Sequence, residues 1–204
     1  MIEKQNILKQ IEEYAAVNKV PIIQKEAAEH LINFIKNKRP KKVLEIGTAI
    51  GYSAILMALH LPHDAKIMTI EKDIARVNQA TLFIAKTKLT NKIEIKTGDA
   101  DTIIPSLNTS FDFVFIDAAK GQYLNHLKKI IPYLEDNAII VADNVLFRGL
   151  ILDKPESEET PKKYRTIVRR LKKYISFVTS DKHFKTEIIE KADGLAVSYY
   201  KKEG

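Results

Sequence analysis

Residues 43–53, VLEIGTAIGYS, decide the fold of this 204-residue chain. An apolar run at 43–46 is typical of a buried strand, Gly47 and Gly51 follow it, and a helical pattern begins at Tyr52. Glycine allows a tight turn and a close approach of the backbone to a ligand, and the start of a helix leaves free N–H groups. The stretch therefore predicts a strand–loop–helix unit with a ligand crevice at the carboxyl end of the strand.

The same loop narrows the class of ligand. The dinucleotide fingerprint G-x-G-x-x-G needs glycine where Ala49 and Tyr52 stand, and no G-K-[ST] triplet follows, which excludes a P-loop. Glu71 ends the next apolar run, 20 residues after Gly51, where a carboxylate accepts hydrogen bonds from ribose hydroxyls. A ribose acid without a phosphate cradle favours a nucleoside such as S-adenosylmethionine. An ordinary βα turn is the alternative, because a glycine loop alone is a weak signal.

Beyond this stretch, short apolar runs alternate with helical patterns. Such alternation predicts a parallel sheet with right-handed crossovers, and Asp193-Gly194 between the last two runs predicts an antiparallel hairpin. We expect strands at 42–46, 66–70, 93–97, 111–117, 138–142, 184–190 and 195–201, and helices at 7–15, 24–38, 52–61, 73–88, 101–107, 123–134 and 161–174. The prediction is one α/β domain over 1–204, with N-terminal helices in 1–40 and a Rossmann-like core in 41–204 whose seven-stranded sheet is mostly parallel.

Composition excludes several kinds of chemistry. The chain has no cysteine, so it has no thiolate nucleophile, Cys-ligated zinc, iron–sulfur cluster or disulfide. The longest apolar run, 54–59, is far too short to span a membrane, and the charged first residues are unlike a secretory signal. We therefore expect a soluble, cytoplasmic protein. Its 33 Lys and Arg against 26 Asp and Glu give a net charge of +7, which suits an anionic partner.

Polar residues also end the later predicted strands. Gly98-Asp99-Ala100 follows the third strand. Asp99 either accepts a hydrogen bond from the exocyclic amine of an adenine or caps the next helix. A cap is the more common role of an aspartate at such a position.

The fourth and fifth strands end in oxygen donors, Asp117 on one and Asp143-Asn144 on the other. Neighbouring parallel strands bring these three side chains together, and oxygen ligands suit Mg²⁺, Mn²⁺ or Ca²⁺. Lys120 would lie beside such a metal and hold or take a hydroxyl proton. Turn and cap residues are the alternative, since Asp and Asn are common at strand ends. The combination with the glycine loop favours a catalytic site.

Five motifs make the chain resemble class I S-adenosylmethionine-dependent O-methyltransferases, and more narrowly the cation-dependent catechol and caffeoyl-coenzyme A O-methyltransferases. They are VLEIGTAIGYSA (43–54), TIEKD (69–73), GDA (98–100), FIDAAKGQY (115–123) and VADNVLFRG (141–149). They occur in the family's order and span about half of the chain. The resemblance implies the class I methyltransferase fold and S-adenosylmethionine as cofactor.

The resemblance also implies roles for individual residues. For the cofactor these are Glu45, Gly47 and Ser53 at the methionine part, Glu71 at the ribose, Asp99 and Ala100 at the adenine, and Ile23 and Asp117 close by. For the chemistry these are Asp117, Asp143 and Asn144 as metal ligands, and Lys120 as the base. A non-catalytic binding module that kept the fold is disfavoured because all four of the latter residues are present.

Within the family the chain most resembles the small bacterial tRNA 5-hydroxyuridine methyltransferases, through its short length, its DNVLFRG motif and its basic balance. This resemblance implies Mg²⁺-dependent methylation of the 5-hydroxyl of the wobble uridine (position 34), the anticodon region of tRNA as partner, and a homodimer. A small catechol-like or caffeoyl-CoA-like acceptor is the alternative, because a metal site of this kind selects vicinal oxygens.

The distribution of basic residues favours RNA over a small catechol. Plotted at 100° per residue, one arc of the helix at 162–175 is apolar and the opposite arc holds seven cations and no acid. These are Lys162, Lys163, Arg165, Arg169, Arg170, Lys172 and Lys173. A second basic cluster lies at 36–42, and Arg148 follows the metal motif. A basic face is usually just solvated. However, like charges that repel one another add support to the prediction of a polyanionic partner.

Overall fold

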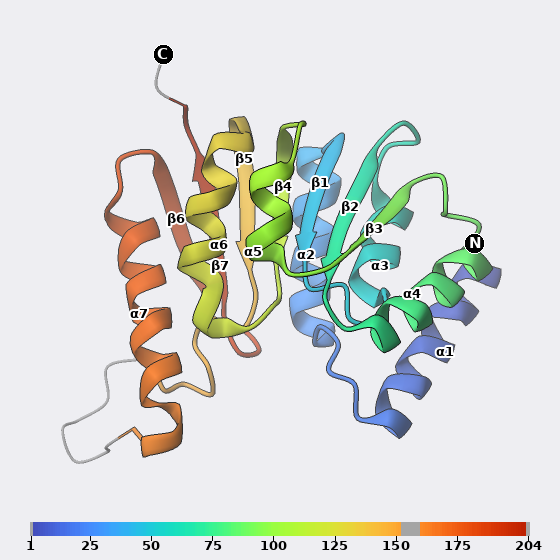
Figure 1. Cartoon of the computed structure of the whole chain (residues 1–204), viewed down its shortest axis with the longest axis horizontal. Helices are drawn as coiled ribbons and strands as arrows, with labels where there is room; N and C mark the ends of the chain where they lie inside the picture. Colours follow the sequence, from blue (N-terminus) through green and yellow to red (C-terminus); the bar gives the residue numbers. More distant parts are fainter. Residues whose placement is uncertain (1, 152–159, 203–204) are drawn as a thin grey trace.

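The structure, a computed structural model, describes residues 2–151 and 160–202, with side chains from residue 6 onward. Within these ranges seven strands form one sheet in the order β3-β2-β1-β4-β5-β7-β6 (Figure 1). The strands β1 to β5 are parallel to one another, whereas β7 runs antiparallel to β5 and β6. The predicted α/β fold, with its mostly parallel sheet and C-terminal hairpin, is confirmed.

The helices and strands follow the predicted alternation. The strands are β1 (Lys42–Ile46), β2 (Lys66–Glu71), β3 (Ile93–Thr97), β4 (Phe111–Ile116), β5 (Leu134–Ala142), β6 (Phe184–Ile189) and β7 (Leu195–Tyr200). The α-helices are α1 (Ile2–Asn18), α2 (Lys25–Lys38), α3 (Tyr52–His60), α4 (Ile74–Thr87), α5 (Ala100–Ile103), α6 (Tyr123–Ile130) and α7 (Arg165–Ser180). Short 3₁₀ turns are η1 (Ile104–Ser106), η2 (Lys120–Gln122), η3 (Ile131–Tyr133) and η4 (Lys162–Tyr164). None of the described helices is long and apolar enough to cross a membrane.

Helices cover both faces of the sheet. Phe113 and Phe115 of β4 pack into the apolar cluster that α1 to α4 form on one face. Val114 and Ile116 pack into the cluster under α5, α6 and α7 on the other face. All four side chains are fully buried, and a strand buried on both faces needs a continuous apolar run rather than alternation. The packing of helices on both faces of the sheet therefore holds the strand ends in fixed positions.

The order of the strands places a crevice at β1. From β1 the chain builds β2 and β3 on one side and then returns to add β4 on the other side. The ends of β1 and β4 stay joined, because the Asp117 N–H donates to the Ile46 carbonyl at 2.9 Å. Such a reversal of strand order is where open α/β sheets bind ligands.

Several element boundaries differ from the sequence prediction. The helix α1 extends beyond 7–15 at both ends, and α6 ends at Ile130 rather than at 134. The strand β5 begins at Leu134, not at 138, because Pro132 ends the preceding helix in η3 and the polar residues after Leu134 stay in the strand. Asn137 has a φ of +59°, and the pairing with β4 shifts register nearby, so a bulge accommodates residues typical of a loop. The helix α7 continues past 174 to Ser180, since Val178 prolongs its buried stripe.

Candidate active site

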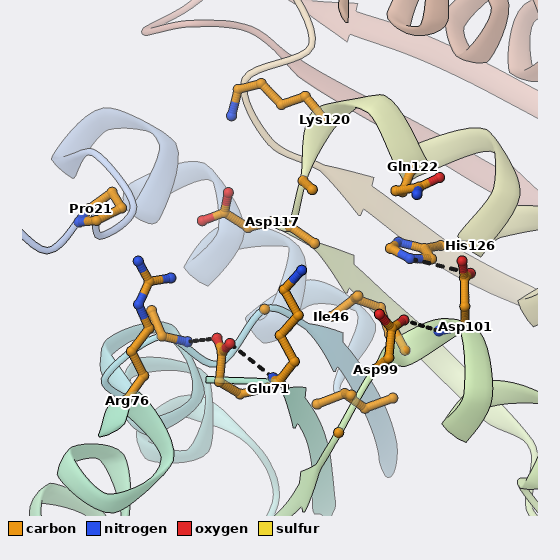
Figure 2. A pocket seen from close by; sticks show the side chains of 18 of the residues that line it. Pro21, Ile46, Glu71, Arg76, Asp99, Asp101, Asp117, Lys120, Gln122 and His126 are labelled. Carbon is orange, nitrogen blue, oxygen red and sulfur yellow. Dashed lines mark hydrogen bonds and ion pairs between the residues drawn. The ribbon is translucent and has the colours of Figure 1, made fainter. Parts of the chain in front are cut away.

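A cavity of about 450 Å³ opens at the carboxyl ends of β1, β2, β3 and β4 (Figure 2). Its volume lies within the range of small-molecule binding sites. Many of the predicted site residues line it, namely Gly47, Glu71, Asp99, Ala100, Asp117, Lys120 and Asn144. Ile23, Glu45, Ser53 and Asp143 do not line it. The parallel sheet thus brings together residues that lie up to 97 positions apart in the chain, from Gly47 to Asn144.

The floor of the cavity depends on Gly47. Its φ is +103°, and a Cβ atom built on it would lie 2.1 Å from the carbonyl oxygen of Asp117. Only a residue without a side chain therefore lets the ends of β1 and β4 approach one another here. Gly51, with a φ of +86°, starts α3 at the other end of the loop.

Glu71 holds the glycine loop in place and faces the cavity (Figure 2). Its carboxylate accepts hydrogen bonds from the backbone N–H groups of Ala49 (2.9 Å), Lys72 (2.9 Å) and Asp73 (3.0 Å). A carboxylate offers about four acceptor positions, so these three bonds fix its orientation and leave capacity for a ligand. This geometry suits the predicted bond to ribose hydroxyls.

Glu45 and Ser53 lie beneath the loop instead of in the cavity. The Ser53 and Thr69 hydroxyls each donate to the Glu45 carboxyl group at 2.5 Å, and Thr48 joins the network through Thr69. Complete burial raises the pKa of Glu45 to about 7, although these hydrogen bonds lower it in part. The pair supports the loop from below, and its contact with a cofactor stays a prediction. The same holds for Ile23, which is buried while its neighbours Pro21 and Ile22 line the cavity.

The far end of the cavity is acidic. Asp99 caps α5, accepting from the Asp101 N–H at 2.8 Å, and it also lines the cavity. The two roles weighed for Asp99, cap and ligand contact, are therefore compatible. His126 of α6 is buried, with Nε2 3.6 Å from Oδ1 of Asp101 (Figure 2). Burial lowers the pKa of His126, so its neutral form faces Asp99 and Asp101.

The three predicted metal ligands follow β4 and β5, which are neighbours in the sheet. Asp117 and Asn144 line the cavity, and Asp143 lies directly behind Asn144, accepting from the Asn144 N–H at 2.6 Å. Lys120 reaches across from η2 and donates to Oδ1 of Asn144 at 2.8 Å. The Tyr123 hydroxyl holds the loop from behind through the Asp143 carbonyl, at 2.9 Å.

The electrostatics of this cluster fit a bound cation. Burial raises the pKa of Asp117, and burial together with the charge of Asp117 raises the pKa of Asp143 to about 7. A divalent cation compensates the cost of ionising buried carboxylates such as these two. In the described part of the chain, no group of three His, Cys, Asp or Glu side chains is placed to hold a metal ion. The donor set here consists of two carboxylates and an amide, which are hard oxygen ligands.

Comparison with known proteins agrees with this geometry. The family model described as "O-methyltransferase" matches residues 1–201. The chain belongs to the O-methyltransferase family. A caffeoyl-CoA O-methyltransferase of Petunia hybrida is 30% identical over 83% of this chain and 74% of its own length. A catechol O-methyltransferase of Niastella koreensis is 37% identical over 58% of this chain and 55% of its own.

The share of its relatives' length that this O-methyltransferase family member covers, and its likeness to solved structures, add to this comparison. It spans a little over half the length of the first curated relatives it matches, with 57% for a caffeoyl-CoA O-methyltransferase of Stellaria longipes. A Staphylococcus aureus structure, provisionally assigned as a caffeoyl-CoA O-methyltransferase, superposes with a TM-score of 0.87 at 28% identity, covering 95% of this chain and 91% of that one. A Bacillus cereus O-methyltransferase in complex with SAH superposes with a TM-score of 0.85 at 20% identity, covering 96% and 91%, and shows the fold alone.

Several residues of the family site were missed by sequence reasoning. Arg76 and Lys72 line the cavity beside Glu71, and Gln122 and His126 line its other side. Arg76 is three residues after Asp73, which caps α4 through the Ala75 and Arg76 N–H groups. The first turn of a helix that starts at the end of a strand lies beside the crevice. The predicted helix start at Asp73 could therefore have indicated Arg76 as a residue of the cavity. Nothing in the sequence marked His126, whose burial depends on the packing of α6.

The basic clusters of this family member lie in different places. All seven cations predicted on the 162–175 helix are exposed. The cluster at 36–42 instead adjoins the start of β1, at the edge of the sheet opposite to the cavity. Arg148 is exposed near the metal motif, with its guanidinium 5.8 Å from the centre of the Tyr164 ring. Of these groups, only the α7 face and Arg148 are on the side of the strand ends.

Proposed function

We propose that this protein transfers a methyl group from S-adenosylmethionine to one of two neighbouring oxygens of an acceptor, with the help of a divalent cation. One observation carries the proposal: the nucleoside-sized cavity and the oxygen-donor cluster share an edge, because Asp117 and Asn144 line the first and belong to the second. A cofactor methyl group and an acceptor oxygen bound at that edge would meet directly. Alignment of this kind supplies roughly 7–11 kcal/mol of the barrier reduction.

The cavity supports S-adenosylmethionine as the methyl donor. Glu71 stands where ribose hydroxyls need an acceptor, and Asp99 and His126 form a polar end for the adenine. The loop between Gly47 and Gly51 has no phosphate-binding sequence, in keeping with a nucleoside that has no pyrophosphate. Solved relatives of the same fold are described as complexes with SAM or SAH.

The proposed chemistry is a single displacement. The acceptor oxygen forms a C–O bond to the methyl carbon while the C–S bond breaks, and S-adenosylhomocysteine leaves. The acceptor proton goes to a base, the role predicted for Lys120, whose Nζ lies at hydrogen-bond distance from Oδ1 of Asn144. Asp117, Asp143 and Asn144 would hold Mg²⁺, Mn²⁺ or Ca²⁺, which lowers the pKa of a bound hydroxyl and fixes two adjacent oxygens when present.

A catechol-like or caffeoyl-like acceptor is the first candidate, because the curated relatives carry those names. The test is methyl transfer to a panel of catechols and matched single phenols, with Mg²⁺ added or removed by EDTA. We expect turnover of catechols only, at least 100-fold loss with EDTA, and a similar loss in Asp143→Ala. A variant Asp143→Ala that keeps full activity would refute the metal role. Failure to bind S-adenosylmethionine in calorimetry would refute both acceptor candidates.

The 5-hydroxyuridine of tRNA is the second candidate, favoured by the exposed basic face of α7 on the side of the cavity. Its 5-hydroxyl and 4-carbonyl oxygens are vicinal, so they meet the same requirement as a catechol. Mass spectrometry of nucleosides from the tRNA of a deletion strain tests it. We expect 5-methoxyuridine-type modification at the wobble position to disappear; unchanged levels would leave the small-molecule acceptor.

The predicted homodimer remains part of the proposal. Its support is a set of exposed apolar side chains, Val17 on α1 with Ile74 and Leu82 on α4, two helices that pack together through Tyr14 and Phe83. Light scattering of the native protein and of Leu82→Lys tests it. A native monomer would refute the dimer, and a dimer unaffected by Leu82→Lys would refute this interface.

A further inference from the structure

A basic groove on the surface lies beside the active-site cavity. Gln122 lines the cavity and also a smaller hollow beside it. That hollow shares Leu124, Lys128 and Lys173 with a shallow depression between α6 and α7. We call these two hollows together the α6–α7 groove. Figure 1 shows the two helices side by side on one face of the sheet.

The α6–α7 groove is positively charged throughout its described length. Six cations line it, and no Asp or Glu does so among the described residues. The six are Lys128, Arg165, Arg169, Arg170, Lys172 and Lys173. Arg165 and Lys172 have further interactions of their own, which leaves Lys128, Arg169, Arg170 and Lys173 to face a ligand. Four cations facing one hollow repel one another, and a polyanion relieves that repulsion.

Arg170 connects this charge to the catalytic end of the groove. Its Nη1 lies 3.4 Å from the carbonyl oxygen of Gly121, the residue directly after Lys120. A Cβ on Gly121 would lie 3.1 Å from the same Nη1, so glycine lets the guanidinium lie close to the turn. At the other side of the groove, Nζ of Lys128 lies 5.5 Å from the centre of the Phe177 ring.

We propose that the α6–α7 groove binds the sugar–phosphate backbone of an RNA whose target base enters the cavity. This inference rests on the second acceptor candidate above. The groove fits a phosphate chain because its cations form a row: Arg169 to Lys173 spans about 6 Å along the helix axis at 1.5 Å per residue. A row that contacts Gly121, between the cavity residues Lys120 and Gln122, positions a strand without reading its sequence, as backbone contacts do.

The opposite basic cluster provides a matched control. Lys36 and Lys41 are exposed cations, but the whole of β1 separates them from the cavity, about 16 Å at 3.3 Å per residue. Removing two charges there changes the net charge of the protein as much as removing two from the groove. Any difference between the two variants therefore reports the position of the charges and not their number.

The experiment measures binding of a fluorescent anticodon stem-loop RNA containing 5-hydroxyuridine, over a range of salt concentrations. We expect Arg169→Gln/Lys173→Gln to weaken binding about tenfold or more and to lower the slope of log K against log salt by about 2, roughly 1 for each lost phosphate contact. Lys36→Gln/Lys41→Gln should leave both values unchanged. Calorimetry with S-adenosylmethionine checks that both variants are folded.

The possible failures can be distinguished. If the native protein does not bind the RNA, the groove and the tRNA acceptor both fall, whereas catechol methylation stands. If the RNA is bound and methylated but the groove variant keeps the native slope, the groove assignment alone is overturned. If coenzyme A displaces the RNA at concentrations where inorganic phosphate does not, the groove belongs to a coenzyme A ester and the RNA assignment is overturned.

Discussion

At the scale of single residues, Glu45 shows how burial controls a carboxyl group in this protein. Its folded-state pKa of about 7 lies above the ordinary 4.5, so the ionised form opposes folding. The stability cost is absent below about pH 4.5 and grows as the pH rises to 7. Glu45→Gln removes the charge, and we expect it to gain about 2–3 kcal/mol of unfolding free energy, relative to the native protein, between pH 5 and pH 8. Urea unfolding at the two pH values measures this; the exposed control Glu29→Gln should show no such trend, and a pH-independent difference for Glu45→Gln would contradict the raised pKa.

Gly47 tests the close approach of β1 and β4. In Gly47→Ala the new methyl group collides with the Asp117 carbonyl oxygen, so the strand ends must separate. Gly149→Ala is a matched control, because Gly149 also has a positive φ, +70°, but no atom within 4 Å of the added Cβ. We expect the control to lose about 1–2 kcal/mol for backbone strain and Gly47→Ala to lose clearly more, together with S-adenosylmethionine binding. Equal losses in chemical denaturation would show that the contact is not limiting.

Sequence reasoning at this scale succeeded where backbone topology alone fixes a position. Glu71, Asp99 and Asp117 stand at strand ends, and parallel strands bring their ends to one edge whatever the side chains do. Sequence reasoning did not distinguish Glu45, which lies outside the cavity, from the residues that line it. Neighbouring positions of a strand point to opposite faces, so a shift of one residue changes the face on which a side chain lies. The same reasoning missed His126 because only the packing of α6 buries that ring.

At the scale of elements, the contact between α6 and α7 holds two tyrosines in an edge-to-face pair with ring centres 5.7 Å apart. The Tyr123 hydroxyl donates to the Asp143 carbonyl, whereas the Tyr174 hydroxyl is buried without a partner in the described structure. We therefore expect Tyr174→Phe to be neutral or to stabilise by up to about 1 kcal/mol, and Tyr123→Phe to destabilise by about 1 kcal/mol. Urea unfolding of the two variants measures the difference, and a destabilising Tyr174→Phe would imply a partner for that hydroxyl.

Element boundaries show where local patterns stop being informative. The sequence predicts every strand of the sheet, because each is an apolar run between turn residues. It places the start of β5 too late, since Glu135, Asp136 and Asn137 are typical of a loop. Pairing of Leu134 and Ile139 with β4, on either side of this polar stretch, keeps it within the strand as a bulge. Cross-strand pairing is a tertiary effect that local propensity does not contain.

At the scale of the whole molecule, the basic clusters of this chain of net charge +7 lie at opposite edges of the sheet. Sequence analysis counts the cluster at 36–42 together with the α7 face, because the composition does not say where the residues lie in the fold. The direction of β1 separates them: it begins at Lys42 and ends at the cavity. Of the basic groups that the sequence analysis singled out, only the α7 face with its groove and Arg148 therefore bear on substrate choice.

The cavity is itself a property of the whole molecule, since its lining comes from segments between Pro21 and Asn144. A ligand that binds only this assembled state stabilises the entire fold, by about 2.7 kcal/mol when its concentration is 100 times its Kd. We expect S-adenosylmethionine to raise the unfolding free energy by this amount. Amide hydrogen exchange should slow to a similar degree at 47–51, 71–73, 98–100 and 117–120. Exchange by local opening at the exposed end of α7, near Ser180, should not slow. Slowing confined to one of these segments would mean that the cofactor does not span the strand ends, and the assignment of Glu71 and Asp99 to one nucleoside would then be wrong.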